Sequence, residues 1–279
     1  MKLLIVGGSG FLGTELARRA AAAGYETAAT YASRPGTAPD VAWRALDVRD
    51  AAQVTRVVAD VAPSVVVNAS SGGADWAVTA EGSLRVAMAA VEHGCRLVHV
   101  SSDAVFSGDR VHYDETCLPD PVTPYGAAKA AAETGVRLLA PHAVVVRTSL
   151  IIGDAGTRSV HEQHVHDLVA GVLAGVLFTD VVRCPVHVSD LAAALLEPAV
   201  CESVEGGVWH IAGPEALSRH QLGVLVARRD GLDTSLLPAG RRVDGGLRGA
   251  LDVRLDSRAT RRRLRTPLRG AREFLAAGT

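Results

Sequence analysis

The segment from Lys2 to Tyr25 restricts the possible folds more than any other part of the chain. It opens with a short apolar run at residues 3–6, continues through a glycine-rich turn, and ends in an Ala- and Leu-rich stretch without Pro. A buried strand, a tight turn and a helix in this order form the first unit of a dinucleotide-binding fold. We therefore expect a dinucleotide site at this end of the chain.

The turn carries three glycines in the spacing Gly-x-x-Gly-x-x-Gly, at Gly7, Gly10 and Gly13. Gly7 is expected to permit the tight turn, Gly10 to let the backbone approach a pyrophosphate, and Gly13 to let helix and strand pack closely. The helix N-terminus then offers free N–H groups and the positive end of its dipole to the phosphates. The competing interpretation is a β–α turn that binds no ligand, and the rest of the chain must decide between the two.

Length, charge and cysteine content exclude several classes of protein. The chain has 279 residues, a formal net charge of −1, and four cysteines without a Cys-x-x-Cys pair. This length fits one large α/β domain with a smaller lobe. The near-zero charge argues against a nucleic acid or an anionic membrane as partner, no apolar run approaches a membrane span, and residues 3–6 are too short for a signal peptide. We expect reduced thiols in a cytoplasmic protein.

Strand and helix patterns alternate along the first half of the sequence. The expected strands are residues 3–6, 26–31, 41–46, 64–67, 96–100 and 143–146, and the expected helices are 11–23, 51–62, 79–93 and one that starts at Pro124. This alternation predicts an α/β fold with a doubly wound parallel sheet of the Rossmann type and a small C-terminal substrate lobe. We assign residues 1–150 to the dinucleotide-binding domain, rejoined by about residues 186–212, and most of residues 151–279 to the lobe.

The C-terminal half has a less regular pattern. Helices are expected at residues 160–176, from Ser189 or Asp190 to Leu196, from the cap Ser218 to Arg228, and at about 267–277, with a strand at 208–211. Residues 107–122 are predicted to form a loop because of their prolines, and residues 239–263 because of their glycines and arginines.

The residues after the second predicted strand indicate which cofactor is used. A site that prefers NAD places Asp or Glu here to hold the ribose 2′-hydroxyl, whereas this chain has Ser33 and Arg34. The charge and the planar fork of an Arg suit a 2′-phosphate. We therefore expect NADPH, with NADH as the alternative. A solvated Arg34 that touches no ligand is the competing interpretation.

Tyr125 and Lys129 are the strongest catalytic candidates. They are four residues apart on a predicted helix and so share one face. With four Tyr and two Lys in the chain, a Tyr-x-x-x-Lys pair is expected by chance only roughly 0.03 times. An adjacent ammonium favours the phenolate and lowers the pKa of the phenol, so the pair can donate a proton to a carbonyl oxygen as hydride reaches its carbon. Ser102 can hydrogen-bond the same oxygen, and Lys129 can also hold the nicotinamide ribose.

Several motifs resemble those of the extended short-chain dehydrogenase/reductase family and, more closely, the dTDP-4-dehydrorhamnose reductases. They are the glycine spacing, the Ser-Ser-Asp-x-Val-Phe-x-Gly run at 101–108, Tyr125-Gly126-x-x-Lys129, Arg147-Thr148-Ser149, and the Pro-Val-His-Val-x-Asp-Leu run at 185–191. This resemblance implies reduction of the 4-keto group of a nucleotide-linked deoxysugar with NADPH or NADH. It also implies that Ser102, Tyr125 and Lys129 are the catalytic residues.

The same resemblance implies a set of cofactor-binding residues. The set is Gly7, Gly10, Phe11, Leu12, Ser33, Arg34, Asp47, Val48, Ala69, Ser70, Tyr125 and Lys129. In the resembled family, an Asp-Val pair after the third strand lines the adenine. Small residues after the fourth strand lie beside the phosphates and ribose, because the cofactor lies against the backbone there.

The chain departs from the resembled family on the substrate side. Ala104 stands where members usually have an aromatic residue, and Leu150 where they often have Trp. The substrate therefore stays open, and a ketoreductase or epimerase of another small substrate is an alternative. So is a non-catalytic, cofactor-binding regulatory subunit such as that of methionine adenosyltransferase. A sugar-nucleotide dehydratase is excluded because it needs an Asp-Glu pair, whereas Asp103 is followed by Ala104. The sequence leaves the oligomeric state open, a homodimer included.

Three histidines lie close together in sequence, at His161, His164 and His166. Their spacing does not match the His-x-x-x-His of a helical zinc site, so we expect no metal. Whether these histidines and Trp76 face the substrate cleft is left open by the sequence.

Overall fold

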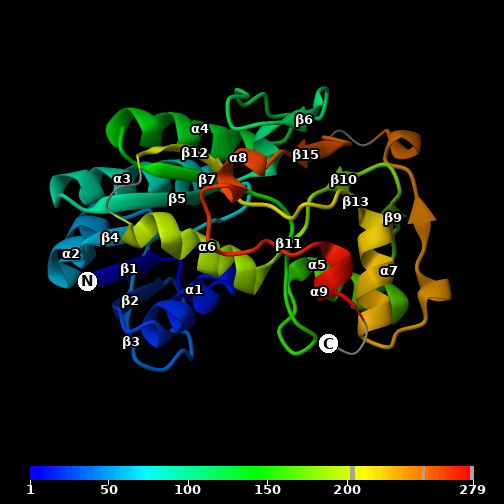
Figure 1. The fold of residues 1–279 in the computed structure, drawn as a ribbon, viewed down its shortest axis with the longest axis horizontal. Coiled ribbons are helices and arrows are strands. Elements are labelled where there is room, and N and C mark those ends of the chain that lie inside the picture. Colours follow the sequence, from blue (N-terminus) through cyan, green and yellow to red (C-terminus); the bar gives the residue numbers. More distant parts are fainter. Residues whose placement is uncertain (202–204, 247–248, 277–279) are drawn as a thin grey trace. The chain divides into compact units, whose positions relative to one another are not determined.

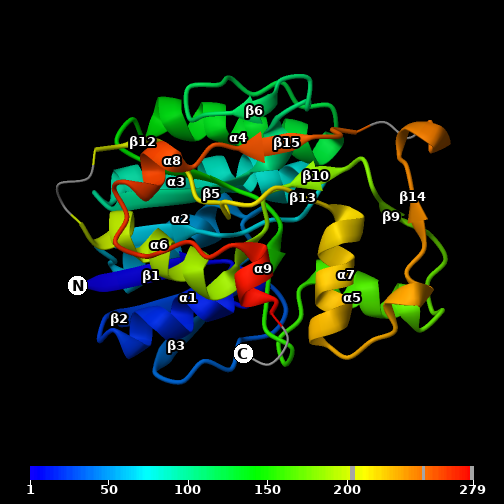
Figure 2. The ribbon, with the colours of Figure 1, turned by 45° about the vertical axis from the view of Figure 1, so that its right-hand side comes forward.

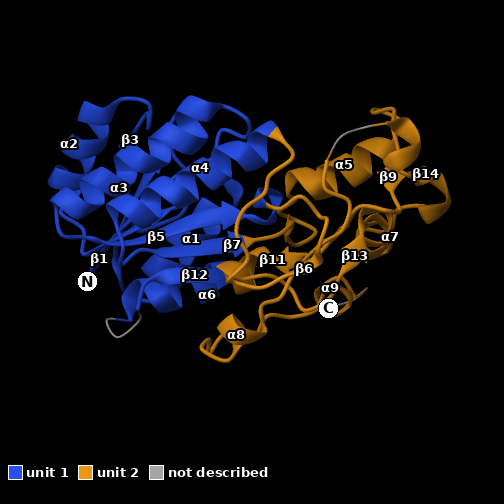
Figure 3. Cartoon of the chain, turned by 90° about the horizontal axis from the view of Figure 1, so that it is seen from above, with its two compact units in different colours: residues 1–105, 124–147, 192–209 blue, residues 106–123, 148–191, 210–279 orange. Residues whose placement is uncertain are grey.

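The computed structural model describes residues 1–201, 205–246 and 249–276 (Figure 1). The chain divides into two compact units (Figure 3). The first comprises Met1–Val105, Pro124–Arg147 and Ala192–Trp209, and the second comprises Phe106–Thr123, Thr148–Leu191 and His210–Thr279. The segment Phe106–Thr123 belongs to the second unit, whereas the sequence-based division placed it within the dinucleotide-binding domain.

The first unit is built on a seven-stranded sheet. In spatial order the strands are β12 (Gly207–His210), β7 (Val144–Thr148), β5 (Arg96–Ser102), β4 (Val65–Asn68), β1 (Lys2–Val6), β2 (Glu26–Tyr31) and β3 (Val41–Ala45). The pairs β1–β2, β1–β4, β2–β3 and β4–β5 are parallel, as the sequence predicted. Strands β2 and β3 lie on one side of β1, and the next strand along the chain, β4, lies on the other side of β1, so the strand order reverses there. In open α/β sheets, ligands bind outside the carboxyl ends of the strands at such a reversal.

Helices cover both faces of this sheet, so the doubly wound prediction is confirmed. The helices that cover the sheet are α1 (Phe11–Ala22), α2 (Ala51–Val61), α3 (Gly82–Glu92), α4 (Pro124–Leu139) and α6 (Val188–Val200). A π-helical turn η1 (Ala77–Glu81) precedes α3, and a 3₁₀ turn η2 (Asp103–Val105) follows β5. Figures 2 and 3 show α2, α3 and α4 on one face and α1 and α6 on the other.

Alternating residues of the strands bury their side chains under α2, α3 and α4. Leu4, Val6, Val66 and Val145 belong to one apolar cluster with residues of these helices, all less than a tenth exposed. The helices contribute residues at helical spacing, such as Val54, Val57, Val58 and Val61 of α2. These matching periods of two and 3.6 residues are why the local pattern predicted this half of the chain well.

The second unit contains short strand pairs and two longer helices. The pairs are β6 (Val111–Tyr113) with β15 (Val253–Leu255), β8 (Ile151–Ile152) with β11 (Val186–His187), β9 (Leu177–Phe178) with β14 (Ala239–Gly240), and β10 (Val182–Arg183) with β13 (Leu217–Ser218). The helices are α5 (Val160–Val169), α7 (Arg219–Arg229), α8 (Arg258–Arg261) and α9 (Ala271–Phe274), with 3₁₀ turns η3 (Thr234–Leu236) and η4 (Val243–Gly245). A second apolar cluster, which includes Val165, Leu168, Leu222 and Val226, joins α5 to α7.

Sequence-based boundaries in the second unit were partly wrong. The helix predicted at 160–176 ends at Val169, because Gly171 adopts a left-handed conformation (φ +67°) and the Val172 amide bonds back to the Asp167 carbonyl oxygen at 2.9 Å. The helix predicted to run to Leu196 begins earlier and continues to Val200. The last helix shortens to Ala271–Phe274, and the predicted end at 277 lies outside the described residues.

Both predicted loops contain strands instead. Residues 107–122 include β6 and residues 239–263 include β15, and the two strands pair with each other through Val253 and Val111. These partners are so distant in sequence that no local pattern indicates the pairing. The Ser218 cap of α7 is confirmed, since its side chain accepts from the Gln221 amide at 3.0 Å.

In the part of the chain that the structure describes, no helix has both the length and the apolar character that crossing a membrane requires.

Candidate active site

The glycine turn after β1 holds backbone segments unusually close together. Gly7 has a left-handed conformation (φ +79°), and a Cβ added to it would lie 2.7 Å from the Cα of Ser70. The Gly10 amide donates to the Gly7 carbonyl oxygen at 3.1 Å, which closes the turn. A Cβ on Gly13 would overlap that same oxygen and lie 2.7 Å from the Cα of Gly8. The predicted conformational reasons for Gly7 and Gly13 are therefore confirmed.

The N-terminus of α1 has no side-chain cap. Gly10 is the N-cap residue and provides no side-chain cap, and the first turn contains no acidic residue. The first N–H groups of the helix, from Phe11 and Leu12 onward, therefore point out of the helix end together with its positive dipole. An anion suits this position. A dinucleotide pyrophosphate fits both the close backbone and the uncapped helix end.

The segment after β4 lies against the same turn. The Ala69 amide donates to the Val6 carbonyl oxygen at 2.9 Å. The buried Asn68 side chain accepts from the Ser70 amide at 3.1 Å and from the Ser70 hydroxyl at 2.6 Å. These bonds fix Ala69 and Ser70 beside Gly7, at the reversal point between β1 and β4.

The predicted adenosine-binding residues lie at the ends of β2 and β3. Ser33 and Arg34 directly follow β2 and are exposed. Asp47 forms an ion pair with Arg49 at 2.7 Å, and the hydrogen bonds from Arg49 lower the pKa of Asp47 to about 2. The Val48 side chain is buried in the apolar cluster under α3. The structure places these residues at one edge of the first unit, and their role toward a cofactor stays a prediction.

The three predicted catalytic residues come together in the first unit. Ser102 ends β5, while Tyr125 and Lys129 lie on α4. Ser102 and Ser71 lie close enough to the Tyr125 hydroxyl for both to lower its pKa, and the Ser102 hydroxyl donates to an Asp103 carboxylate oxygen at 3.3 Å. The Lys129 ammonium is buried, 3% exposed, and donates to the Val100 carbonyl oxygen at 3.0 Å. Ser102 in turn accepts from the Ala104 amide at 3.2 Å, which fixes its side chain.

Burial, rather than the neighbouring ammonium, dominates the acidity of Tyr125. Burial raises the pKa of the phenol above its usual value, and the negative charge of Asp103 raises it further, whereas the hydrogen bonds from Ser102 and Ser71 lower it. The sequence-based expectation of a lowered pKa was therefore wrong for the free protein. Burial also lowers the pKa of Lys129 to about 8, against the opposing effect of Glu133. Tyr125 is thus protonated at neutral pH, and most of Lys129 remains charged.

Ser71 is a site residue that the sequence reasoning missed. It precedes a loop anchored by Thr79, whose buried hydroxyl donates to the Gly73 carbonyl oxygen at 2.8 Å and accepts from the Gly72 amide at 3.0 Å. Thr79 lies in the π-helical turn η1, a feature that is frequent at functional sites. The only available signal was that Ser71 follows the predicted cofactor residues Ala69 and Ser70. Trp76, in the same loop, is 49% exposed, so it is not a core residue.

Two histidines of α5, His161 and His166, have separate partners. The Nδ1 atom of His161 accepts from the Arg219 guanidinium at 3.3 Å, and burial together with Arg219 lowers the pKa of His161 to about 3. His166 contacts an Asp230 carboxylate oxygen through Nε2 at 2.6 Å. Among the described residues, no three His, Cys, Asp or Glu side chains are grouped in a way that could hold a metal ion.

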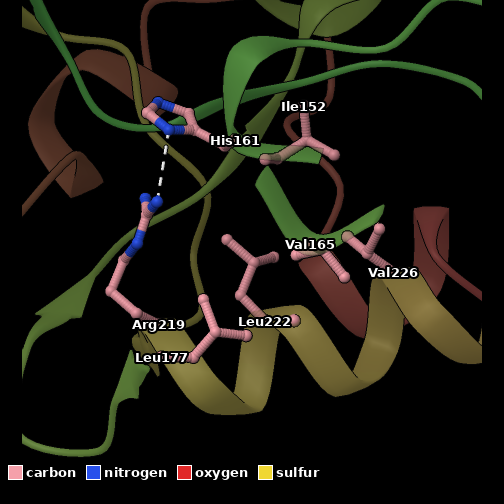
Figure 4. A pocket seen from close by; sticks show the side chains of 8 residues that line it. Ile152, His161, Val165, Leu177, Arg219, Leu222 and Val226 are labelled. Atoms are coloured by element: carbon pink, nitrogen blue, oxygen red, sulfur yellow. Dashed lines mark hydrogen bonds between the residues drawn. The ribbon is translucent and has the colours of Figure 1, made fainter. Parts of the chain in front are cut away.

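His161 and Arg219 also border a small cavity with the apolar side chains of α5 and α7 (Figure 4). Its volume is about 10 Å³. That is room for at most one water molecule, so this cavity is too small for a sugar or a nucleotide.

Comparison with known proteins agrees with this geometry. The family model described as the RmlD substrate binding domain matches residues 1–269. The chain belongs to this family. Two curated relatives in it are dTDP-4-dehydrorhamnose reductases: one from Aggregatibacter actinomycetemcomitans is 28% identical, over 81% of this chain and 78% of the relative, and one from Mycobacterium tuberculosis is 32% identical, over 78% and 72%.

Solved structures show the same fold as this RmlD-family chain. The dTDP-4-dehydrorhamnose reductase of Bacillus anthracis, in complex with NADP, aligns with a TM-score of 0.82 at 22% identity over 98% of this chain and 96% of that one. A more distant relative is the β subunit of methionine adenosyltransferase 2 from Bos taurus, which is 27% identical over 66% of this chain and 56% of the relative.

Proposed function

We propose that this protein is an NADPH-dependent reductase of a keto group, with the 4-keto group of a nucleotide-linked deoxysugar as substrate. One observation carries the proposal. Ser70 packs against the glycine turn at Gly7, and the next residue, Ser71, lies close enough to the Tyr125 hydroxyl to lower its pKa. Two consecutive residues, Ser70 and Ser71, therefore connect the predicted pyrophosphate site at Gly7 with Tyr125, the proposed proton donor. NADH is the alternative hydride donor.

The bound cofactor supplies a hydride to the carbonyl carbon of the substrate. As the C=O bond opens, its oxygen gains negative charge and takes the proton of the Tyr125 hydroxyl, which leaves a phenolate. Hydrogen bonds from Ser102 and Ser71 stabilise that phenolate, and the Lys129 ammonium on the same helix face stabilises it by charge. The raised pKa of free Tyr125 keeps the proton in place until the carbonyl oxygen becomes basic enough to accept it.

The substrate class is supported by relatives named dTDP-4-dehydrorhamnose reductase. The family model is named for substrate binding and extends through most of the second unit. We therefore assign substrate contacts to that unit, which includes Leu150 at one of the departures from the family pattern. A cytoplasmic location stays a prediction, and the oligomeric state stays open.

A substrate screen tests the proposal directly. We expect NADPH oxidation with nucleotide-linked 4-keto sugars and little or none with simple ketones. Turnover of simple ketones alone would favour the general ketoreductase, and interconversion of sugar epimers without net cofactor oxidation would favour the epimerase. No turnover with any keto sugar, together with stoichiometric co-purification of a partner enzyme, would establish the regulatory alternative.

Replacing Arg34 by Ala is expected to weaken NADPH binding about 10- to 100-fold and to leave NADH binding almost unchanged. The reason is the loss of a charge-assisted bond to the 2′-phosphate, of order 1.5–3 kcal/mol. Titration calorimetry with each cofactor provides the measurement. Arg56→Ala, at an exposed position on α2, is the matched control and should change neither affinity. If Arg34→Ala weakens the binding of NADPH and of NADH equally, Arg34 does not bind the 2′-phosphate.

A further inference from the structure

A fully buried ion pair lies in the first unit between α4 and the sheet. Glu133 of α4 is 1% exposed, Arg147 of β7 is 1% exposed, and Ser101 of β5 is 2% exposed. The Arg147 guanidinium donates to both carboxylate oxygens of Glu133, with Nε at 3.0 and 3.2 Å and a terminal nitrogen at 2.8 Å. The Ser101 hydroxyl donates to the same carboxylate at 2.5 Å. All of these donors face the one Glu133 carboxylate, which pairs with the Arg147 guanidinium at 2.8 Å.

Glu133 lies one helical turn after Lys129 on the same face of α4. Lys129 is itself buried, and its ammonium has one backbone acceptor, the Val100 carbonyl oxygen. An ammonium in an apolar interior tends to lose its proton unless an anion is near. Glu133 is that anion: its charge opposes the effect of burial on Lys129.

The other ionisable groups around Lys129 offer no substitute. His99, on β5, is fully buried, and burial together with the charge of Lys129 lowers the pKa of His99 to about 3, so it is neutral. Tyr125 precedes Lys129 by one turn and is protonated in the free protein. The charge of Asp103 acts on Tyr125, whereas the charged group that acts on Lys129 is Glu133. Arg147 adds positive charge, which Glu133 must also balance.

Stability alone does not account for a pair in this place. Two charges removed from water lose their hydration, and apolar residues of similar volume often serve a core as well or better. The pair lies next to the helix turn that carries the acid and the ammonium. A function connected with that ammonium is the simpler reason for it.

We propose that Glu133, fixed by Arg147 and Ser101, is a positioning residue that keeps Lys129 charged beneath Tyr125 during proton transfer. The inference rests on the proposed reductase function, because the charge of Lys129 matters when the Tyr125 phenolate forms. Glu133 touches neither substrate nor cofactor in this scheme. It acts only through Lys129.

The chain offers a direct measurement, since Lys2 and Lys129 are its two lysines. In protein labelled with ¹³C-lysine, a Lys2→Arg background leaves Lys129 as the one lysine signal, and its side-chain ¹³C shift reports its titration. We expect Glu133→Gln, which retains an oxygen acceptor but loses the charge, to lower the Lys129 pKa by about 1–3 units. Glu133→Asp keeps the charge and should leave that pKa near the wild-type value.

Two further variants separate charge from packing. The double variant Glu133→Gln/Arg147→Gln removes one charge of each sign, so its Lys129 pKa should lie between those of Glu133→Gln and the wild type. If Glu133→Gln does not fold, the double variant must still lie below the wild type. Ser101→Ala, which removes a donor but no charge, should shift the Lys129 pKa far less than Glu133→Gln.

The pH profile of turnover provides the second readout. Below its pKa Lys129 is charged, so the alkaline limb of kcat/KM should move to lower pH in Glu133→Gln by the same amount as the Lys129 titration. A Lys129 pKa that is the same in all variants, or an alkaline limb that does not follow it, overturns the inference. If the wild-type protein fails to oxidise NADPH with every keto substrate tested, the proposed function is overturned instead. The lysine titration does not depend on turnover, so it separates these two failures.

Discussion

Replacing Tyr125 by Phe is expected to lower kcat for carbonyl reduction about 100- to 10,000-fold, the usual contribution of a positioned general acid. The substitution removes one oxygen and keeps the ring. The Ser102 and Ser71 hydroxyls then lose their common partner, and the substrate oxygen loses its proton donor. Cofactor affinity should stay within a few-fold of the wild type, because the glycine turn and the uncapped end of α1 are untouched.

Stopped-flow measurement of NADPH oxidation with saturating substrate gives kcat, and cofactor fluorescence gives the affinity. Tyr25→Phe is the matched control, since Tyr25 is a half-buried tyrosine immediately before β2, whereas the predicted cofactor residues Ser33 and Arg34 follow the other end of that strand. We expect wild-type turnover from that variant. Undiminished turnover in Tyr125→Phe would exclude Tyr125 as the proton donor.

Removing one partner of the buried ion pair should have the largest effect on stability. Glu133→Leu removes the carboxylate that pairs with the buried Arg147 guanidinium, and the expected loss is about 3–5 kcal/mol of the free energy of unfolding. The double variant Glu133→Leu/Arg147→Leu removes both charges and should recover most of that loss, because an apolar pair of similar volume carries no desolvation penalty. Urea unfolding of Glu133→Leu, Arg147→Leu and the double variant measures the coupling free energy between the two side chains.

An exposed pair supplies the comparison. Glu81, the last residue of η1, forms an ion pair with Arg85 of α3, and their side chains are 48% and 22% exposed. Glu81→Gln should change the free energy of unfolding by less than about 1 kcal/mol, since water and salt screen such pairs. Equal losses from Glu81→Gln and Glu133→Leu would mean that burial does not set the importance of the Glu133–Arg147 pair.

Local patterns were sufficient for most of the first unit. Strand β2 has the predicted bounds, and α2 ends one residue before its predicted end, where Ala62 adopts a left-handed conformation ahead of Pro63. The glycine turn was predicted for the right reason: Gly7 and Gly13 have no room for a Cβ. Each of these features depends on residues near in sequence, so a periodic pattern or a turn residue is enough to indicate it.

The second unit depends on contacts between distant residues, and prediction was poorer there. Strands β6 and β15 pair with each other, through residues such as Val111 and Val253. Short segments of this kind have no strong pattern of their own. The loops predicted at 107–122 and 239–263 were wrong for that reason.

By itself, the sequence determined the cofactor fold and singled out Tyr125 and Lys129 as the predicted acid and its lysine, because a strand–glycine–helix unit and a Tyr-x-x-x-Lys spacing are local features. Only the tertiary structure decided the electrostatics of the site. Ser71 reaches Tyr125 from a loop after β4, and Arg147 reaches Glu133 from a neighbouring strand. Burial then raises the pKa of Tyr125 and lowers that of Lys129, against the direction expected from their proximity alone. Desolvation depends on everything packed around a group, and that is information no spacing of residues contains.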